Sequence, residues 1–288
     1  MHRISRISFP GLGIGEFEVD SVAFSIGNFT IAWYALIITF GVICAVAYAY
    51  FRAKKINVTS DDIMDYALFV VPIGVLGGRL YYVLTSLEKY HSFKDVINIR
   101  NGGIAIYGGI LAGALAMFLV SKVKKISFLA FADCAMPGII LAQSIGRWGN
   151  FMNGEAFGAE TDVFCRMGLL NRWTGYELTY VHPTFLYESL WNLLGFILIN
   201  VFYKHKKYDG QIVLMLFAWY GFGRMLIEGL RQDSLYSTIF GITFRTSQVL
   251  AGFFFISATA TLLYLFFKKF NKPLYVKEKT DKTAKKGQ

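Results

Sequence analysis

Seven apolar runs divide the chain, and polar or charged residues separate each run from the next. The runs are Phe29–Phe51, Tyr66–Leu87, Gly102–Val120, Ile126–Gly146, Thr184–Tyr203, Gln211–Leu230 and Thr246–Phe267. Each has about the 20 residues that an α-helix needs to cross the hydrocarbon core of a bilayer. A transmembrane β-barrel is excluded, because its strands alternate polar and apolar residues. The pattern therefore predicts an all-α polytopic membrane protein with seven transmembrane helices.

Lys and Arg are unevenly divided between the two ends of these runs. The segments that follow the first, third, fifth and seventh runs contain 17 of the 29 cations, and the N-terminal segment and remaining connections contain 10. Cation-rich segments stay in the cytoplasm. We therefore expect the N-terminus outside and the C-terminus inside. Topology and attraction to anionic lipid then explain the net charge of +10, so no nucleic acid partner is expected.

The connections indicate one membrane domain, residues 1–270, followed by a tail. The longest connection, residues 147–183, is rich in aromatic and turn residues and should fold as a small extracytoplasmic cap. Residues 271–288 are polar and Lys-rich, which predicts a disordered cytoplasmic tail. The three cysteines have neither a disulfide framework nor metal-ligand spacing, so no metal or cofactor is expected.

Charged side chains inside the apolar runs are candidates for function, because each costs free energy in lipid. These residues are Arg79, Glu188, Arg224 and Glu228, with Asp133 nearer a kink at Pro137. One interpretation is a set of ion pairs that fasten helices together. The other is a pocket for a phospholipid head group, which the excess of guanidinium groups favours.

The densest polar stretch directly follows the fourth run. Arg147, Asn150, Asn153 and Glu155 occur there within nine residues, among several glycines that let the backbone approach a ligand. A cation, two amides and a carboxylate so close together indicate a site for an anionic head group more than a simple membrane anchor.

The same stretch, Gly146-Arg147-Trp148-Gly149-Asn150-Phe151-Met152-Asn153-Gly154-Glu155, resembles the signature of the prolipoprotein diacylglyceryl transferase family. Supporting blocks follow the family order over nearly the whole chain. They are Trp33-Tyr34, Gly77-Gly78-Arg79, the block from Gly102 to Gly109, His182-Pro183-Thr184, Tyr187-Glu188, Tyr220, Arg224, Glu228, Arg231 and Ser247-Gln248. The Gly-Arg-x-Gly-Asn-Phe-x-Asn block is specific, whereas each of the others would be weak alone.

The resemblance implies an enzyme of bacterial lipoprotein maturation. It would transfer the diacylglyceryl group of phosphatidylglycerol to the lipobox cysteine thiol in the signal peptide of a preprolipoprotein. The products would be a thioether and glycerol 1-phosphate. The resemblance also implies a multi-pass protein of the bacterial cytoplasmic membrane, with seven spans and an active site toward the outer face.

Roles for individual residues follow from that chemistry. A departing phosphate needs cations that bind it more tightly as charge develops, which suits Arg147 and Arg224, with Arg79 assisting. The expected catalytic residues are Arg147, Arg224, Tyr107 and Glu155. Phosphatidylglycerol is expected to contact Arg147, Arg224, Asn150, Asn153, Tyr34, Arg79 and Glu228. Asn150 and Asn153 are expected to orient head-group oxygens, and Glu155 and Glu228 to hold the arginines in position.

Tyr107 has two possible roles, because some family members carry His where this chain has Tyr107. A tyrosine hydroxyl is protonated at neutral pH and makes a poor general base. Tyr107 either positions substrate by a hydrogen bond or acts as an unusual base. We favour the first role, with the arginines supplying a positive field that activates the thiol.

A lipid flippase or transporter is the alternative function, since buried charges and glycines occur there too. The chain shows no inverted repeat, and its buried charges gather toward one face rather than forming a path across. Dependence on a cysteine-bearing peptide would distinguish the two functions.

Overall fold

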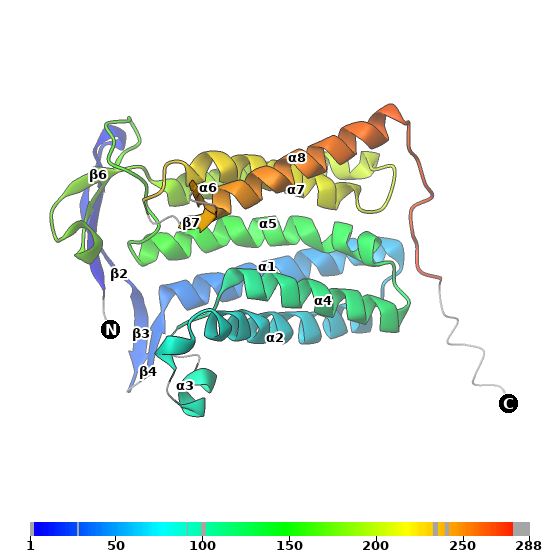
Figure 1. Cartoon of the computed structure of the whole chain (residues 1–288), viewed down its shortest axis with the longest axis horizontal. Coiled ribbons are helices and arrows are strands. Elements are labelled where there is room, and N and C mark those ends of the chain that lie inside the picture. The colour runs from blue at the N-terminus through cyan, green and yellow to red at the C-terminus, as the bar shows by residue number, and fades with distance from the viewer. Residues whose placement is uncertain are drawn as a thin grey trace. The chain divides into compact units, whose positions relative to one another are not determined.

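The computed structural model describes residues 3–27, 29–90, 92–98, 102–232, 236–239 and 242–278 (Figure 1). Seven long helices carry most of these residues, and each lies within six residues of a predicted run at either end. They are α1 (Trp33–Ala53), α2 (Ser60–Leu84), α4 (Ile106–Lys124), α5 (Phe128–Met152), α6 (Thr184–Phe202), α7 (Gln211–Glu228) and α8 (Thr246–Phe267). A short helix, α3 (Phe93–Ile97), lies between α2 and α4 in the chain.

Six helices in the described part of the chain are long and apolar enough to cross a membrane. These are α1, α2, α4, α5, α6 and α8. Helix α7 fills the remaining predicted run over 18 residues, with Arg224 and Glu228 in its last two turns. The protein is therefore a mostly helical polytopic membrane protein, as the apolar pattern predicts.

Short strands are the part of the fold that the hydrophobic pattern did not predict, so the protein is not purely α-helical. The described strands are β1 (Ile4–Phe9), β2 (Ile14–Asp20), β3 (Val22–Ile26), β4 (Phe29–Ala32), β5 (Met167–Leu170), β6 (Thr179–Val181), β7 (Tyr236–Ile239) and β8 (Ile242–Arg245). One antiparallel sheet has the order β2-β1-β5-β6, and β3-β4 and β7-β8 form hairpins. Since β4 occupies residues Phe29–Ala32, the first helix begins at Trp33 rather than at Phe29.

The four-stranded sheet joins the N-terminal arm to the connection predicted to form the cap. Ile7 of β1 lies opposite Leu169 of β5, and both are at most 1% exposed. Val181 of β6 and Phe185 at the start of α6 complete the same apolar core. Burial of each such side chain stabilises the fold by about 1.5–3 kcal/mol. The sheet thus anchors the segment that connects α5 to α6.

The chain divides into two compact units, the first comprising residues Met1–Tyr48 and Ala135–Pro273. Within it, α7 packs against both α6 and α8, and Figure 1 shows these helices side by side. Small residues bring α1 and α5 together, since a Cβ added at Gly138 would lie 2.8 Å from the carbonyl oxygen of Ala45. Close contact through small residues is typical of helix pairs in membranes.

The second unit comprises residues Ala49–Cys134 and Leu274–Gln288. Its helices α2 and α4 pack along one another, and α2 begins with a capping box formed by Thr59 and Asp62. The Asp62 carboxylate also accepts a 2.5 Å hydrogen bond from Lys277, which belongs to the predicted tail. Residues 279–288 of that tail lie outside the described residues.

Candidate active site

Glu188, on the second turn of α6, is the centre of a cluster of arginines in the first unit. Its carboxylate is 4% exposed. Nη2 of Arg147 lies 2.5 Å from its Oε2, and Nη1 of Arg224 lies 2.7 Å from its Oε1. Nη1 of Arg231 approaches the same Oε1 at 3.5 Å. One buried carboxylate therefore gathers guanidinium groups from α5, from α7 and from the segment after α7.

A second buried carboxylate extends this cluster. Glu228 pairs with Arg224 one turn earlier on α7 and is 1% exposed. Its backbone carbonyl accepts a hydrogen bond of 2.6 Å from Nη1 of Arg245. Around these two glutamates, the described residues thus bring together four arginines. This excess of positive charge at low exposure favours an anionic ligand that makes charge-assisted hydrogen bonds.

The two central arginines are held so that part of each guanidinium group stays available. Within the described part of the chain, Arg147 and Arg224 make their side-chain contacts through Nη1 and Nη2. Their Nε–H groups are not used in these contacts. Each arginine is thus fixed in orientation by protein groups and retains a donor for a ligand.

Helix α5 continues past the predicted end at Gly146 and carries both Arg147 and Asn150 on its last turns. Oδ1 of Asn150 accepts a hydrogen bond of 3.4 Å from Nη1 of Arg147. The amides of Asn150 and Asn153 both donate to Oε1 of Glu155, at 3.3 and 3.0 Å. A continuous polar chain therefore runs from Glu188 through Arg147 and Asn150 to Glu155.

The turn that carries Glu155 has two residues in the left-handed region of backbone conformation. Gly154 has φ +59° and Ala156 has φ +58°. For a residue with a Cβ this conformation costs about 1–3 kcal/mol, so surrounding contacts must hold it. Thr184 supplies one such contact by donating a 2.5 Å hydrogen bond to the carbonyl of Ala156. Asn171 supplies another by donating a 2.8 Å hydrogen bond to the carbonyl of Gly154.

A pocket opens beside this turn. It has a volume of about 400 Å³ and is lined by Asn150, Glu155, Ala156, Phe157, Trp173, Arg231 and Gln232. Arg231 connects the pocket to Glu188, and Asn150 connects it to Arg147. The pocket thus places polar donors and one cation around a space of the size that suits a small organic head group.

Two tryptophans fix the register of α6 and α7 next to the cluster. Trp191 and Trp219 stack with ring centroids 4.2 Å apart and an interplanar angle of 12°. Each Nε1–H donates a 3.0 Å hydrogen bond to the backbone carbonyl of the other residue. The indole of Trp191 lies over Gly223, and that of Trp219 lies over Gly195. We call this reciprocal arrangement the tryptophan clamp; it lies one turn from Glu188 on α6 and beside Arg224 on α7.

Tyr34, one of the predicted head-group contacts, lies next to the last turns of α5. It lies on the first turn of α1, and its ring packs over Gly149, where an added Cβ would lie 2.8 Å from Cδ2 of Tyr34. Gly149 directly precedes Asn150, so the tyrosine borders the polar end of α5. With Arg147, Asn150, Asn153, Glu155, Arg224 and Glu228, seven of the nine predicted site residues lie in the first unit.

The other two predicted site residues, Arg79 and Tyr107, belong to the second unit. The guanidinium group of Arg79 is 6% exposed and donates five hydrogen bonds to backbone carbonyls. The acceptors are Asp95, Val96, Asn98, Gly102 and Gly103, at 2.7–3.0 Å. All five donors of the group are therefore engaged. Tyr107 is the second residue of α4 and is half-buried.

Glu188 and Arg231 are the central residues that the predicted site set omitted. Both occur in motif blocks of the sequence, but only the fold reveals that Glu188 is shared by three arginines. The tryptophan clamp was also missed, because its two residues are 28 positions apart and read as ordinary aromatics in apolar runs.

Comparisons with known proteins agree on one family. Residues 21–264 match the family described as prolipoprotein diacylglyceryl transferase. A phosphatidylglycerol–prolipoprotein diacylglyceryl transferase of Clostridium perfringens is 46% identical over 76% of the chain and 85% of its own length. A transferase with that description from Listeria welshimeri is 40% identical over 96% of the chain and 100% of its own length. A transferase with that description from Streptococcus pneumoniae is 42% identical over 90% of the chain and 98% of its own length.

Proposed function

The chain belongs to the prolipoprotein diacylglyceryl transferase family, and from this premise we propose that the arginine cluster around Glu188 is its catalytic site. The protein is a transferase that moves the diacylglyceryl group of phosphatidylglycerol to prolipoprotein. The observation that carries the site assignment is the convergence of Arg147, Arg224 and Arg231 on one buried carboxylate.

The acceptor in this proposal is the thiol of the lipobox cysteine in a preprolipoprotein signal peptide. The thiol first loses its proton to water, because the thiolate is the nucleophile. The thiolate sulfur then attacks the carbon of the diacylglyceryl group that is bonded to the phosphate oxygen. A C–S bond forms as the C–O bond breaks, and the electron pair leaves with glycerol 1-phosphate. The products are a thioether-linked diacylglyceryl group and the phosphate monoester.

The leaving phosphate gains negative charge as the C–O bond breaks. Arg147 and Arg224 are pre-positioned by Glu188 and bind this charge without reorganisation at the moment of reaction. Asn150 and Asn153 orient the head group beside the 400 Å³ pocket, and Glu155 holds the two amides. Glu228 holds Arg224 from the other side.

The remaining predicted residues have supporting roles in this proposal. Tyr34 borders the head group next to Gly149, and Tyr107 positions substrate by a hydrogen bond without serving as the base. Arg79 assists phosphate binding only if its loop releases carbonyl contacts, because its five donors are engaged. We assign its main role to ordering the segment between α2 and α4.

The proposed arrangement in the membrane follows from the distribution of charge. All seven long helices span the bacterial cytoplasmic membrane, α7 included, with the N-terminus outside and the C-terminus in the cytoplasm. The four-stranded sheet then forms the extracytoplasmic cap. The arginine cluster lies in the outer half of the bilayer, next to that cap.

The test is a transfer assay with purified enzyme in phosphatidylglycerol liposomes and a lipobox peptide. We expect Arg147→Lys and Arg224→Lys each to lower kcat by about 10²–10³-fold, since Lys lacks the bidentate fork. Arg6→Lys is the matched control, because the exposed side chain of Arg6 pairs with Glu18 between β1 and β2 and does not line the pocket. Near-normal rates in both cluster variants would contradict the site assignment. If a peptide with Ser in place of the lipobox Cys supported the same rate of phosphatidylglycerol turnover as the Cys peptide, the proposed thiol acceptor would be contradicted.

A further inference from the structure

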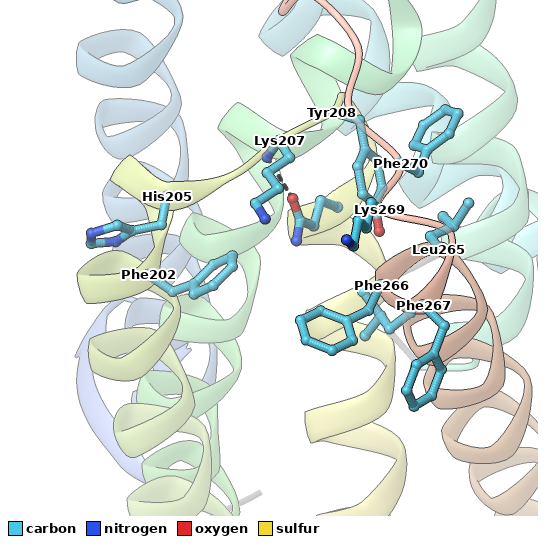
Figure 2. Close-up of a pocket in the computed structure, with 11 residues that line it drawn as sticks. Phe202, His205, Lys207, Tyr208, Leu265, Phe266, Phe267, Lys269 and Phe270 are labelled. Carbon is cyan, nitrogen blue, oxygen red and sulfur yellow. Dashed lines mark hydrogen bonds between the residues drawn. The ribbon is translucent and has the colours of Figure 1, made fainter.

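A second large pocket lies at the opposite end of α6 from Glu188. It has a volume of about 590 Å³ and is formed by the C-terminal ends of α6 and α8 and the segments that follow them (Figure 2). Its lining residues are Phe202, His205, Lys207, Tyr208, Gln211, Leu262, Leu265, Phe266, Phe267, Lys269 and Phe270. Phe202 is 14 residues beyond Glu188 on one helix, which places it about 21 Å away along the helix axis. This pocket is therefore separate from the arginine cluster.

Two lysines give the pocket a positive charge. Lys207 and Lys269 are both exposed, and neither forms a salt bridge with any of the described residues. Neighbouring Lys206 differs, since its Nζ lies 3.1 Å from Asp209 and its side chain is 6% exposed. The charge of Lys206 is thus neutralised inside the protein, whereas Lys207 and Lys269 present theirs at the pocket.

Backbone contacts fix the walls of the pocket. The amide of Lys272 donates a 3.1 Å hydrogen bond to the carbonyl of Lys207, which ties the segment after α8 to the one after α6. The amide of Lys207 donates a 2.7 Å hydrogen bond to Oε1 of Gln211, marked in Figure 2. The rings of Tyr208 and Phe270 meet edge to face at 5.2 Å. These contacts hold the walls of the pocket together.

The apolar side of the pocket lies where two candidate membrane spans end. The candidate spans Thr184–His205 and Thr246–Phe267 both finish here. Phe266 and Phe267 are 70% and 77% exposed, so their rings contact lipid in a membrane. The lysines lie on the polar side, just beyond the spans. A ligand that fits must be amphipathic, with an anionic group and a hydrocarbon chain.

We propose that this pocket binds an anionic phospholipid from the leaflet at this end of the helices. The lipid phosphate lies between Lys207 and Lys269, and an acyl chain lies along Phe266 and Phe267. Lysine binds phosphate as a point charge and needs no fixed fork, which suits head groups of different size. This lipid is a bound structural ligand and takes no part in the transfer reaction.

Native mass spectrometry of the full-length protein tests this site with dioleoyl phosphatidic acid as the probe. Lys207→Gln combined with Lys269→Gln should lower the affinity for one bound probe molecule by about tenfold or more. The control combines Lys204→Gln with Lys268→Gln, which removes two exposed cations at the same end of the helices that do not line the pocket. The control should bind the probe like the wild type. Equal probe binding by the pocket variant and the control would overturn the proposal.

Two further measurements distinguish binding of a whole lipid from binding of a bare anion or of any acyl chain. The affinities of the wild type and the pocket variant for dioleoyl phosphatidylcholine should differ by less than twofold, since this lipid has no net charge. Inorganic phosphate at a concentration equal to the probe should displace little of it, because phosphate lacks the acyl chain. Displacement by phosphate in proportion to its concentration would show an anion site and contradict lipid binding. Transfer activity should be retained in the pocket variant, which also verifies that it is folded.

Discussion

Replacing Gly223 with Ala tests whether the tryptophan clamp positions the arginine cluster. A Cβ at residue 223 would lie 2.6 Å from Cε2 of Trp191 and closer still to its Nε1. Ordinary contact begins near 3.4 Å, so the indole must move by more than 0.8 Å. That movement breaks the 3.0 Å hydrogen bond from Trp191 to Trp219 and separates α6 from α7. Glu188 and Arg224 lie on those two helices and separate with them.

The expected size of the effect follows from the displacement. Overpacking of this kind destabilises a protein by about 1–3 kcal/mol, which a membrane protein held by several helices can tolerate. A shift of about 1 Å in a catalytic group costs about 10²-fold in rate. We therefore expect Gly223→Ala to lower kcat/KM by about 10²-fold while the protein remains folded. Transfer rates in liposomes and a thermal unfolding curve provide the two measurements.

Two comparisons make the test specific. Gly252→Ala on α8 is the matched control, because its Cβ would lie 3.5 Å from Sδ of Met225, an ordinary contact. Trp191→Leu removes the indole that the new methyl group strikes. In that background, Gly223→Ala should lower the remaining activity by less than about threefold. A wild-type rate for Gly223→Ala, or the same loss in both backgrounds, would refute the positioning role of the clamp.

Three other experiments test the turn, the base and the topology. Gly154→Ala places a Cβ at φ +59° and 2.5 Å from Nδ2 of Asn171. The free energy of unfolding should fall by about 1–3 kcal/mol and transfer should slow, so an unchanged melting temperature and an unchanged rate would contradict this prediction. Tyr107→Phe should keep at least a tenth of the activity; a loss of about 10²–10⁴-fold that His restores would identify Tyr107 as the base. In a Cys165→Ser background, Tyr176→Cys should react with an impermeant thiol reagent added outside and Val123→Cys should not; the reverse pattern would overturn the topology.

The helices of this protein are well predicted from its sequence because a membrane imposes one dominant rule. About 20 apolar residues are needed per crossing, and that rule acts within each segment separately. Arg147 and Arg224 could both be proposed as ligands of one anion: Arg147 from the polar stretch after the fourth run, and Arg224 because a cation inside an apolar run is costly in lipid and requires a partner or ligand. Glu188 could not be identified as that partner, because the register between α6 and α7 depends on the tryptophan clamp.

The strands and the role of Arg79 depend on contacts that sequence patterns do not encode. Strands β5 and β6 have four and three residues, too few for alternation of polar and apolar positions to stand out. Arg79 has the residue type of a phosphate ligand, but five backbone carbonyls surround it. Whether carbonyls or a ligand satisfy a buried guanidinium group depends on the path of the neighbouring loop.

The hydrogen bond from Asn171 to Ser5 has a consequence for how the protein is made. This bond joins residues 166 positions apart. The same amide of Asn171 also donates to the carbonyl of Gly154, so Asn171 connects the first strand of the chain to the turn that carries Glu155. At a synthesis rate of 5–20 residues per second, β1 exists for about 8–33 s before Asn171 has been added. During that interval most of the helices are already synthesised, while one edge of β1 has no β5 to pair with and is open to wrong partners.

Ordering of the Glu155 turn therefore cannot begin before residue 171 has been added, whatever the stability of the turn itself. A nascent chain arrested before residue 171 would contain Arg147, Asn150 and Glu155 but lack the contact that fixes their turn. The enzyme would thus acquire its catalytic geometry only after its N-terminal and central segments had both been delivered to one compartment.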